Sequence, residues 1–282
     1  MDRRDFIAAL GASGLGALSG CGGLPGNRVM SDDPPEGCGV PDSFGANRGS
    51  LPADETPTDG IPPAVSETPP SRDVDPTSFD TYTANGTEVP LVPVEVARYW
   101  WLRGAARFAD ARDPALYDRS HVYGAVLSPA PGIPYDGCDP ATYWPDGDRI
   151  ICYCGCPHHL SSLRAAALIE EGFEKVYAID EGFWEWHRRG FPVAGERPEW
   201  APTREFIVKG TTDPKYANQT AWIRVPAENQ SEATKIGPDG NFTLEPKFSG
   251  VSPATPVVIE TPEYTVNTTL QNATSGVVAA ES

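Results

Sequence analysis

One segment restricts the fold of this chain more than any other. An apolar strand from Arg149 to Cys154 runs directly into a loop that contains Gly155, and a helix follows from Ser161 or Ser162 until Gly172 ends it. A buried strand that passes straight into a helix is typical of a parallel sheet covered by helices. The unit therefore predicts an α/β domain.

The neighbouring segments repeat this alternation. The residues from 92 to 103 and from 183 to 189 have helical composition, whereas 105–109, 122–127 and 176–179 are short apolar strands. We therefore expect a mostly parallel sheet with helices on both faces, over residues 87–198.

The pattern changes after Trp200. Short alternating strands follow one another without helices, and the turn Gly237–Pro238–Asp239–Gly240 separates two of them. This pattern predicts a small all-β, sandwich-like domain over 199–272 with no chemical constellation of its own. Residues 273–282 are expected to form a flexible tail.

The first 21 residues have the pattern of an export signal. Arg3 and Arg4 precede an uncharged apolar run, which ends in Leu18-Ser19-Gly20-Cys21. The run has about half the length that a helix needs to cross a bilayer. We interpret it as a twin-arginine lipoprotein signal, with Cys21 as the lipidated first residue of a protein anchored to the outer face of the cell membrane.

Residues 22–86 resemble a spacer. Much of the chain's content of 28 Gly and 30 Pro lies in such loop-like segments, and this one has hardly any consecutive apolar residues. We therefore expect a disordered linker. Cys38 lies within it, and a disulfide with Cys138 is one candidate pairing, because a free thiol is unusual in an exported protein.

The net charge of the chain bears on its possible partners and on the kind of organism that it comes from. With 39 acidic against 22 basic residues, the net charge of -17 disfavours nucleic acid as a partner and is typical of a halophile. The sequence does not indicate an oligomeric state. Sequons predict glycosylation at Asn85, Asn218, Asn229, Asn241, Asn267 and Asn272.

The strand–loop–helix unit also predicts chemistry. Cys154 stands at the strand end, where loop amides and the N-terminal end of the helix favour negative charge. Both effects stabilise a thiolate and an anion beside it. Cys154 is therefore the candidate nucleophile.

Several separate pieces between Pro90 and Val193 resemble the single-domain rhodaneses. They occur in that family's order: Asp110-Ala111-Arg112, His121-Val122-Tyr123-Gly124-Ala125, Ile151 to Cys154 with Ser161 or Ser162, and a closing run that includes Asp180, Gly182, Phe183, Trp186 and Gly190-Phe191-Pro192-Val193. The resemblance implies a rhodanese-like fold and sulfur transfer through a persulfide on Cys154.

The resemblance also implies roles for other residues. Asp110, Arg112 and His121 would support the structure, and the loop would bind a small sulfur-containing anion, with a thiol as acceptor and no metal or organic cofactor. The implied substrate-binding residues are Gly155, Cys156, His158, His159, Ser161 and Ser162.

The loop departs from the family pattern, because it is one or two residues longer and lacks Arg. We expect protonated His158 or His159 to hold a dianionic donor better at acidic pH. Cys156 is positioned to resolve a persulfide as a disulfide, or simply fills the loop.

Two other classes of function stay open. Cys152, Cys154, Cys156, His158 and His159 are metal-ligand types within eight positions, although no second ligand pair is visible in the sequence. A non-catalytic surface module that only binds a partner is the other alternative, because fold does not imply function.

Overall fold

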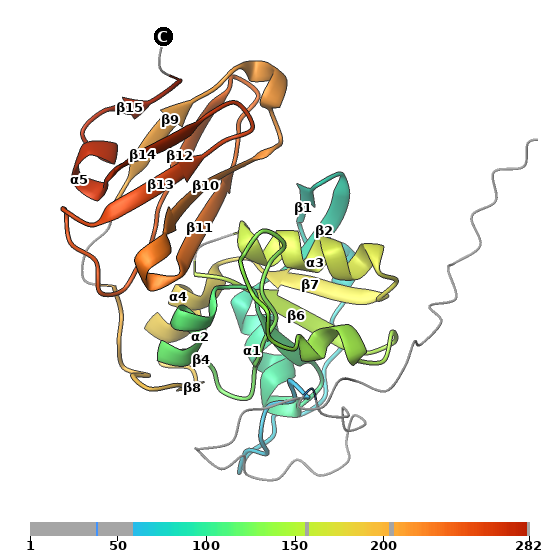
Figure 1. Cartoon of the computed structure of the whole chain (residues 1–282). Coiled ribbons are helices and arrows are strands. Elements are labelled where there is room, and N and C mark those ends of the chain that lie inside the picture. The colour runs from blue at the N-terminus through green and yellow to red at the C-terminus, as the bar shows by residue number, and fades with distance from the viewer. Residues whose placement is uncertain (1–37, 39–58, 156–157, 203–205, 281–282) are drawn as a thin grey trace, which may run out of the picture.

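The computed structural model describes residues 38, 59–155, 158–202 and 206–280. Figure 1 shows an α/β part and, after it in the chain, a group of strands coloured orange to red. Among the described residues, no helix has both the length and the apolar character that a membrane crossing requires.

The α/β part is built on a six-stranded sheet with the strand order β1-β2-β7-β6-β3-β5. β1 pairs with β2 in antiparallel fashion, and the other neighbours are parallel, so the sheet is mixed. The short strands β4 and β8 pair separately. The strands are β1 (Thr81–Ala84), β2 (Thr87–Val92), β3 (Arg107–Asp110), β4 (His121–Val122), β5 (Val126–Leu127), β6 (Arg149–Tyr153), β7 (Lys175–Ile179) and β8 (Val193–Ala194).

Helices cover both faces of this sheet. One apolar cluster joins Trp100 and Trp101 of α1 to Phe183 and Trp186 of α4, and a second cluster holds the apolar side of α3. The segment 122–127, expected as one strand, is divided between β4 and β5. The helices are α1 (Val94–Arg103), α2 (Pro114–Arg119), α3 (Leu160–Glu170) and α4 (Gly182–Arg188), with the 3-10 turns η1 (Pro76–Ser78) and η2 (Pro140–Tyr143).

The expected linker does not extend to residue 86. Gly60 accepts a hydrogen bond from the backbone N–H of Phe108 (2.8 Å), and Ile61 is buried. β1 adds an edge strand to the sheet. Contacts with distant residues therefore order a segment whose own composition has little to bury. The earlier part of the expected linker lies outside the described residues, apart from Cys38.

The disulfide candidate from the sequence is confirmed. Cys38 and Cys138 are bonded, with their Cα atoms 5.5 Å apart and 100 residues between them in the sequence. The bond attaches Cys38 to the loop before η2.

The C-terminal region forms two further sheets, with the strand orders β11-β10-β13-β14 and β12-β9-β15. They share one apolar cluster, to which both sheets contribute, for example Ile223 from β10 and Leu244 from β12. The elements are β9 (Val208–Thr211), η3 (Pro214–Tyr216), β10 (Thr220–Val225), η4 (Pro226–Glu228), β11 (Gln230–Lys235), β12 (Asn241–Leu244), β13 (Pro256–Glu260), β14 (Thr265–Thr269), α5 (Leu270–Ala273) and β15 (Val277–Val278).

Three details of this region differ from expectation. The turn at 237–240 leads from one sheet to the other, because β11 pairs with β10 whereas β12 pairs with β9. A short helix, α5, interrupts the strands. Part of the expected tail forms β15, which pairs in parallel with β9.

One strand of this region lies against the α/β part. Every residue of β11 except Lys235 is buried, although most of its side chains are polar. The backbone N–H of Ser231 donates to the Asp113 carboxylate (3.1 Å), and the indole of neighbouring Trp222 lies against Gly132. β11 is therefore covered on both faces, by its own sheets and by the domain that contains Cys154.

Candidate active site

Cys154 follows β6 directly and is fully buried. Its Sγ lies 3.4 Å from Oγ of Ser161, in the first turn of α3. The thiol therefore lies beside the N-terminal end of a helix of 11 residues, where the helix dipole favours a negative charge.

The expected serine cap is wrong in detail. α3 begins at Leu160, so His159 is the N-cap residue and makes no side-chain capping bond. Ser161 and Ser162 are inside the helix and fully buried, and Oγ of Ser162 has no hydrogen-bond partner among the described residues. The longer loop lets the helix start before the serines.

The chain after Cys154 is tied to α4. The carbonyl of Cys154 accepts from the N–H of Phe183 (2.7 Å), and that of Gly155 accepts from the N–H of Trp184 (3.4 Å). A Cβ atom added at Gly155 would lie 3.1 Å from Nε1 of Trp184 and 3.8 Å from Oε2 of Glu232. An indole and a carboxyl group from different parts of the chain therefore lie beside Gly155.

The C-terminal region covers the thiol. Cys154 belongs to an apolar cluster with Leu160 of α3 and Ala233 of β11, and Trp222 of β10 packs against that cluster. Cys154 itself has no exposed surface.

Asp110 and Arg112 occupy the supporting position that the resemblance implies. Both are buried, and the guanidinium donates to the carboxylate through Nε (2.9 Å) and Nη2 (2.6 Å). Arg112 also donates to the carbonyl of Ser120 (2.6 Å) and stacks over the ring of Phe183. This two-point pair links β3 to the start of β4 and to α4.

His121 also has a structural environment. Its Nδ1 lies 2.7 Å from the carbonyl of Tyr117, and its ring stacks on the Tyr117 ring with a 4.0 Å centroid distance. Burial lowers the pKa of His121, and the contact with Tyr117 only partly offsets this effect. The ring therefore packs as a neutral imidazole at neutral pH.

The two loop histidines have partners away from the thiol. His158, at a positive φ of 64°, pairs through Nε2 with the Asp180 carboxylate. Nε2 of His159 lies 3.3 Å from Oγ1 of Thr234 on β11. Burial, followed by the neighbouring His158, lowers the pKa of His159 to about 4. Burial therefore disfavours an imidazolium at His159, and the acid-dependent role expected of the two histidines stays a prediction.

The other cysteines differ in their environments. Cys152 is buried in the cluster under α3, and burial raises its pKa to about 12. Cys156 lies outside the described residues, so its expected role stays a prediction. In the described part of the chain, no group of three or more His, Cys, Asp or Glu side chains is arranged to hold a metal ion.

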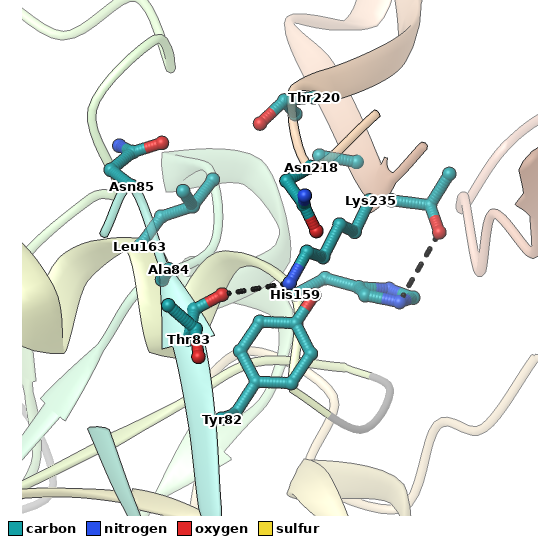
Figure 2. Close-up of a pocket in the computed structure, with 11 residues that line it drawn as sticks. Tyr82, Thr83, Ala84, Asn85, His159, Leu163, Asn218, Thr220 and Lys235 are labelled. Carbon is teal, nitrogen blue, oxygen red and sulfur yellow. Dashed lines mark hydrogen bonds between the residues drawn. The ribbon is translucent and has the colours of Figure 1, made fainter. Parts of the chain in front are cut away.

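A small, partly open cavity lies next to this site, between the α/β part and the C-terminal sheets (Figure 2). Lys235 extends across it and donates to the carbonyl of Thr83 (3.1 Å), with its ammonium 4.9 Å from the centre of the Tyr82 ring. His159 forms part of its wall. β11 thus contacts both the cavity and the loop after Cys154.

Sequence reasoning missed this contribution of β11. Its sequence, Gln-Ser-Glu-Ala-Thr-Lys, has one apolar residue, which resembles an exposed edge strand rather than the wall of a buried site. Tyr82 was missed because it falls within the expected linker. Neither segment carries a local signal that would have identified it.

All six sequon asparagines are exposed, as glycan attachment requires. Asn85 and Asn218 stand on opposite sides of the cavity, where Figure 2 labels them. Their modification stays a prediction. Cys21 lies outside the described residues.

A mixed, mostly parallel sheet with a cysteine between a central strand and a helix places this part of the chain in the α/β class, and a family model matches it. Residues 99–189 match the model of the Rhodanese-like domain. This part of the chain is therefore a rhodanese-like domain.

Solved structures that match part of this chain include the rhodanese-like domain of an Anabaena protein, with 22% identity, coverage of 41% of this chain and 86% of that one, and a TM-score of 0.35. A Bacillus halodurans protein has 21% identity, 37% and 76% coverage, and a TM-score of 0.32. A Rhodopseudomonas palustris protein of unknown function, described as a possible tyrosine phosphatase, has 22% identity, 37% and 84% coverage, and a TM-score of 0.31.

The Asp113 carboxyl group, which contacts the backbone of β11, should make the stability of the protein depend on pH. Its carboxylate accepts from the N–H groups of Leu116 and Ser231, and burial raises its pKa to about 6. The folded chain therefore binds a proton here between about pH 4 and 6 that the unfolded chain does not bind, and stability falls as the pH rises through that range. We expect the parent to lose about 2 kcal/mol more than Asp113→Asn between pH 4 and 7.

Urea unfolding of both proteins at each pH measures this difference. Asp213→Asn, a change at an exposed carboxylate, serves as the control for net charge. Equal pH dependence in the parent and Asp113→Asn would contradict the assignment.

Proposed function

We propose that this chain is an extracytoplasmic, membrane-anchored sulfurtransferase that moves sulfane sulfur from a thiosulfate-like donor to a thiol acceptor through a persulfide on Cys154. The observation that carries the proposal is the position of this thiol: it ends a central strand of a rhodanese-like domain and lies 3.4 Å from a hydroxyl in the first turn of α3.

The chemistry has two balanced steps. The Cys154 thiolate attacks the outer sulfur of thiosulfate, the S–S bond of the donor breaks, and sulfite leaves with its electron pair. An acceptor thiolate then attacks the outer sulfur of the Cys154 persulfide, and the Cys154 thiolate is released. The helix dipole and loop amides stabilise the anionic sulfur in both steps.

Other residues hold this geometry in place. The Asp110–Arg112 pair connects β3 with Ser120 and Phe183, and the bond from Phe183 to the Cys154 carbonyl fixes the strand end. The N-terminal pattern that ends in Cys21 supports the proposed anchor.

Mass spectrometry of the purified mature protein after thiosulfate treatment tests the proposal. We expect a mass increase of one sulfur atom that maps to the Cys154 peptide and disappears when a thiol acceptor is added. An unchanged Cys154 peptide under conditions in which iodoacetamide alkylates the same residue would contradict sulfurtransferase activity.

One observation favours a second function, a non-catalytic binding module. Cys154 has no exposed surface, and β10 and β11 contribute to the cluster that covers it. In such a module the loop would be a structural contact between the two parts of the chain. Cys154 would then resist both thiosulfate and iodoacetamide in the native protein, whereas an enzyme reacts with both.

A further inference from the structure

Trp184 of α4 carries a buried hydrogen-bond donor. Its Nε1 atom has no hydrogen-bond partner among the described residues. A buried tryptophan N–H usually has an acceptor, because burial removes the water that would otherwise accept from it. Such a donor therefore calls for an acceptor from outside the chain.

This donor lies beside the residue that follows the candidate nucleophile. A Cβ atom on Gly155 would lie 3.1 Å from Nε1 of Trp184 and 3.6 Å from the adjoining Cδ1. The N–H edge of the indole therefore faces Gly155. The φ angle of Gly155 is not in the left-handed region that favours glycine. The missing side chain thus leaves room in front of the donor and does not serve an unusual turn.

The fold fixes the direction of this donor. The Trp184 ring makes edge contacts with the rings of Phe183 (5.0 Å between centroids) and Trp200 (5.4 Å). The backbone N–H of Trp184 also donates to the carbonyl of Gly155 (3.4 Å). Oγ of Ser162 is likewise buried without a partner in the described part of the chain. A hydroxyl, however, rotates toward any nearby acceptor, whereas an indole N–H points along its ring plane.

We propose that Trp184 is a substrate-binding residue of the Cys154 site, and that its indole N–H donates to an oxygen of a small oxyanion held by the loop. The ligand class is a tetrahedral oxyanion, of which the sulfonate end of thiosulfate is one example. The loop contains no Arg, and the nearby guanidinium of Arg112 is paired with Asp110. A neutral, directional donor therefore takes the place of a charged one, and its bond to a charged oxygen is a strong one.

This inference rests on the proposed function, which names thiosulfate as the reactant. The bond changes are the same: the Cys154 sulfur bonds to the outer sulfur, the S–S bond of the donor breaks, and sulfite leaves with the electron pair. Negative charge therefore gathers on the sulfonate oxygens as sulfite departs. A hydrogen bond from Trp184 to one of these oxygens stabilises that charge and holds the donor in place.

Indole N–H signals in the NMR spectrum test this contact without relying on sulfur transfer. Sulfate is the probe, because it is a dianion of similar shape to thiosulfate with no S–S bond to break. The isotope-labelled parent has seven Trp, and the signal of Trp184 is assigned by its nuclear Overhauser contact with Gly155. The ionic strength is held constant with potassium gluconate, because added salt changes the screening of the net charge of -17.

We expect sulfate to move the Trp184 indole proton downfield, and to move it further than any other indole proton. Trp184→Phe keeps an aromatic ring but removes the donor, so it should bind sulfate about tenfold more weakly. The amide signal of Gly155 measures that affinity in every variant. Trp200→Phe is the matched control, because it removes an indole that packs on Trp184 but leaves the Trp184 donor, and it should bind sulfate as the parent does.

Two results would overturn the inference. One is a Trp184 indole proton that does not move in sulfate, a measurement on the parent that needs no variant to fold. If that proton responds instead to Glu232→Gln, the carboxyl group beside Gly155 is its acceptor. The other is an equal loss of sulfate affinity in Trp184→Phe and Trp200→Phe, which would show that the packing of the ring matters and its N–H does not.

The proposed function is tested separately by persulfide formation. A sulfate contact at Trp184 with no persulfide from thiosulfate would leave an anion-binding site without sulfurtransferase activity. Persulfide on Cys154 with an unmoved indole proton would leave the activity and remove Trp184 from the site.

Discussion

Cys154→Ser should abolish donor-dependent persulfide on this chain, whereas Cys152→Ser should retain it. Both thiols are buried and only two residues apart, but they occupy different environments. Cys154 lies beside the first turn of α3, and Cys152 packs into an apolar cluster where burial raises its pKa to about 12. Because the thiolate is the nucleophile, Cys152 remains an unreactive thiol at neutral pH.

Peptide mapping after thiosulfate treatment measures this difference. The serine variants change one atom each, so the fold of both can be compared with the parent by circular dichroism. Persulfide that maps to Cys156 in the parent, or that persists in Cys154→Ser, would reassign the sulfur carrier. Loss in both variants would indicate that the strand end, not the thiol, was disturbed.

Cys21→Ser should release the protein from membranes. The reason is chemical, since a serine hydroxyl cannot take the thioether-linked lipid that the Leu18 to Cys21 pattern predicts. We expect the membrane-bound fraction to fall about tenfold or more, as removal of a hydrocarbon anchor implies. Fractionation of cells that express the parent and the variant measures it.

Cys152→Ser is the control, because it makes the same replacement within the folded domain. A second arm changes Arg3 and Arg4 to Lys, which should keep the precursor inside the cell. Membrane association of Cys21→Ser equal to that of the parent would contradict the anchor.

Much of the fold was predictable because the relevant signals are local. The apolar run 149–154 predicts β6. The helix α1 ends at Arg103, where the expected helix ends, and Gly104 caps it in a left-handed conformation with φ of 55°. The alternation of strands and helices implies a sheet covered on both faces. Strand order and the edge strand β1 were not predictable, because backbone pairing between distant segments leaves no pattern in either segment.

The residues of the candidate site also fall into two groups, those that local patterns identify and those that only the folded chain brings together. The sequence alone identified Cys154, its strand, its helix and the Asp110–Arg112 support, because these lie in short motifs with fixed spacing. Only the tertiary structure decided that His158 pairs with Asp180, that Cys38 is bonded to Cys138, and that β11 brings Glu232 to Gly155. These partners are 22 to 100 residues apart in the chain. Their pairing depends on how the packed layers meet, and that depends on the shape of the whole chain rather than on any local pattern.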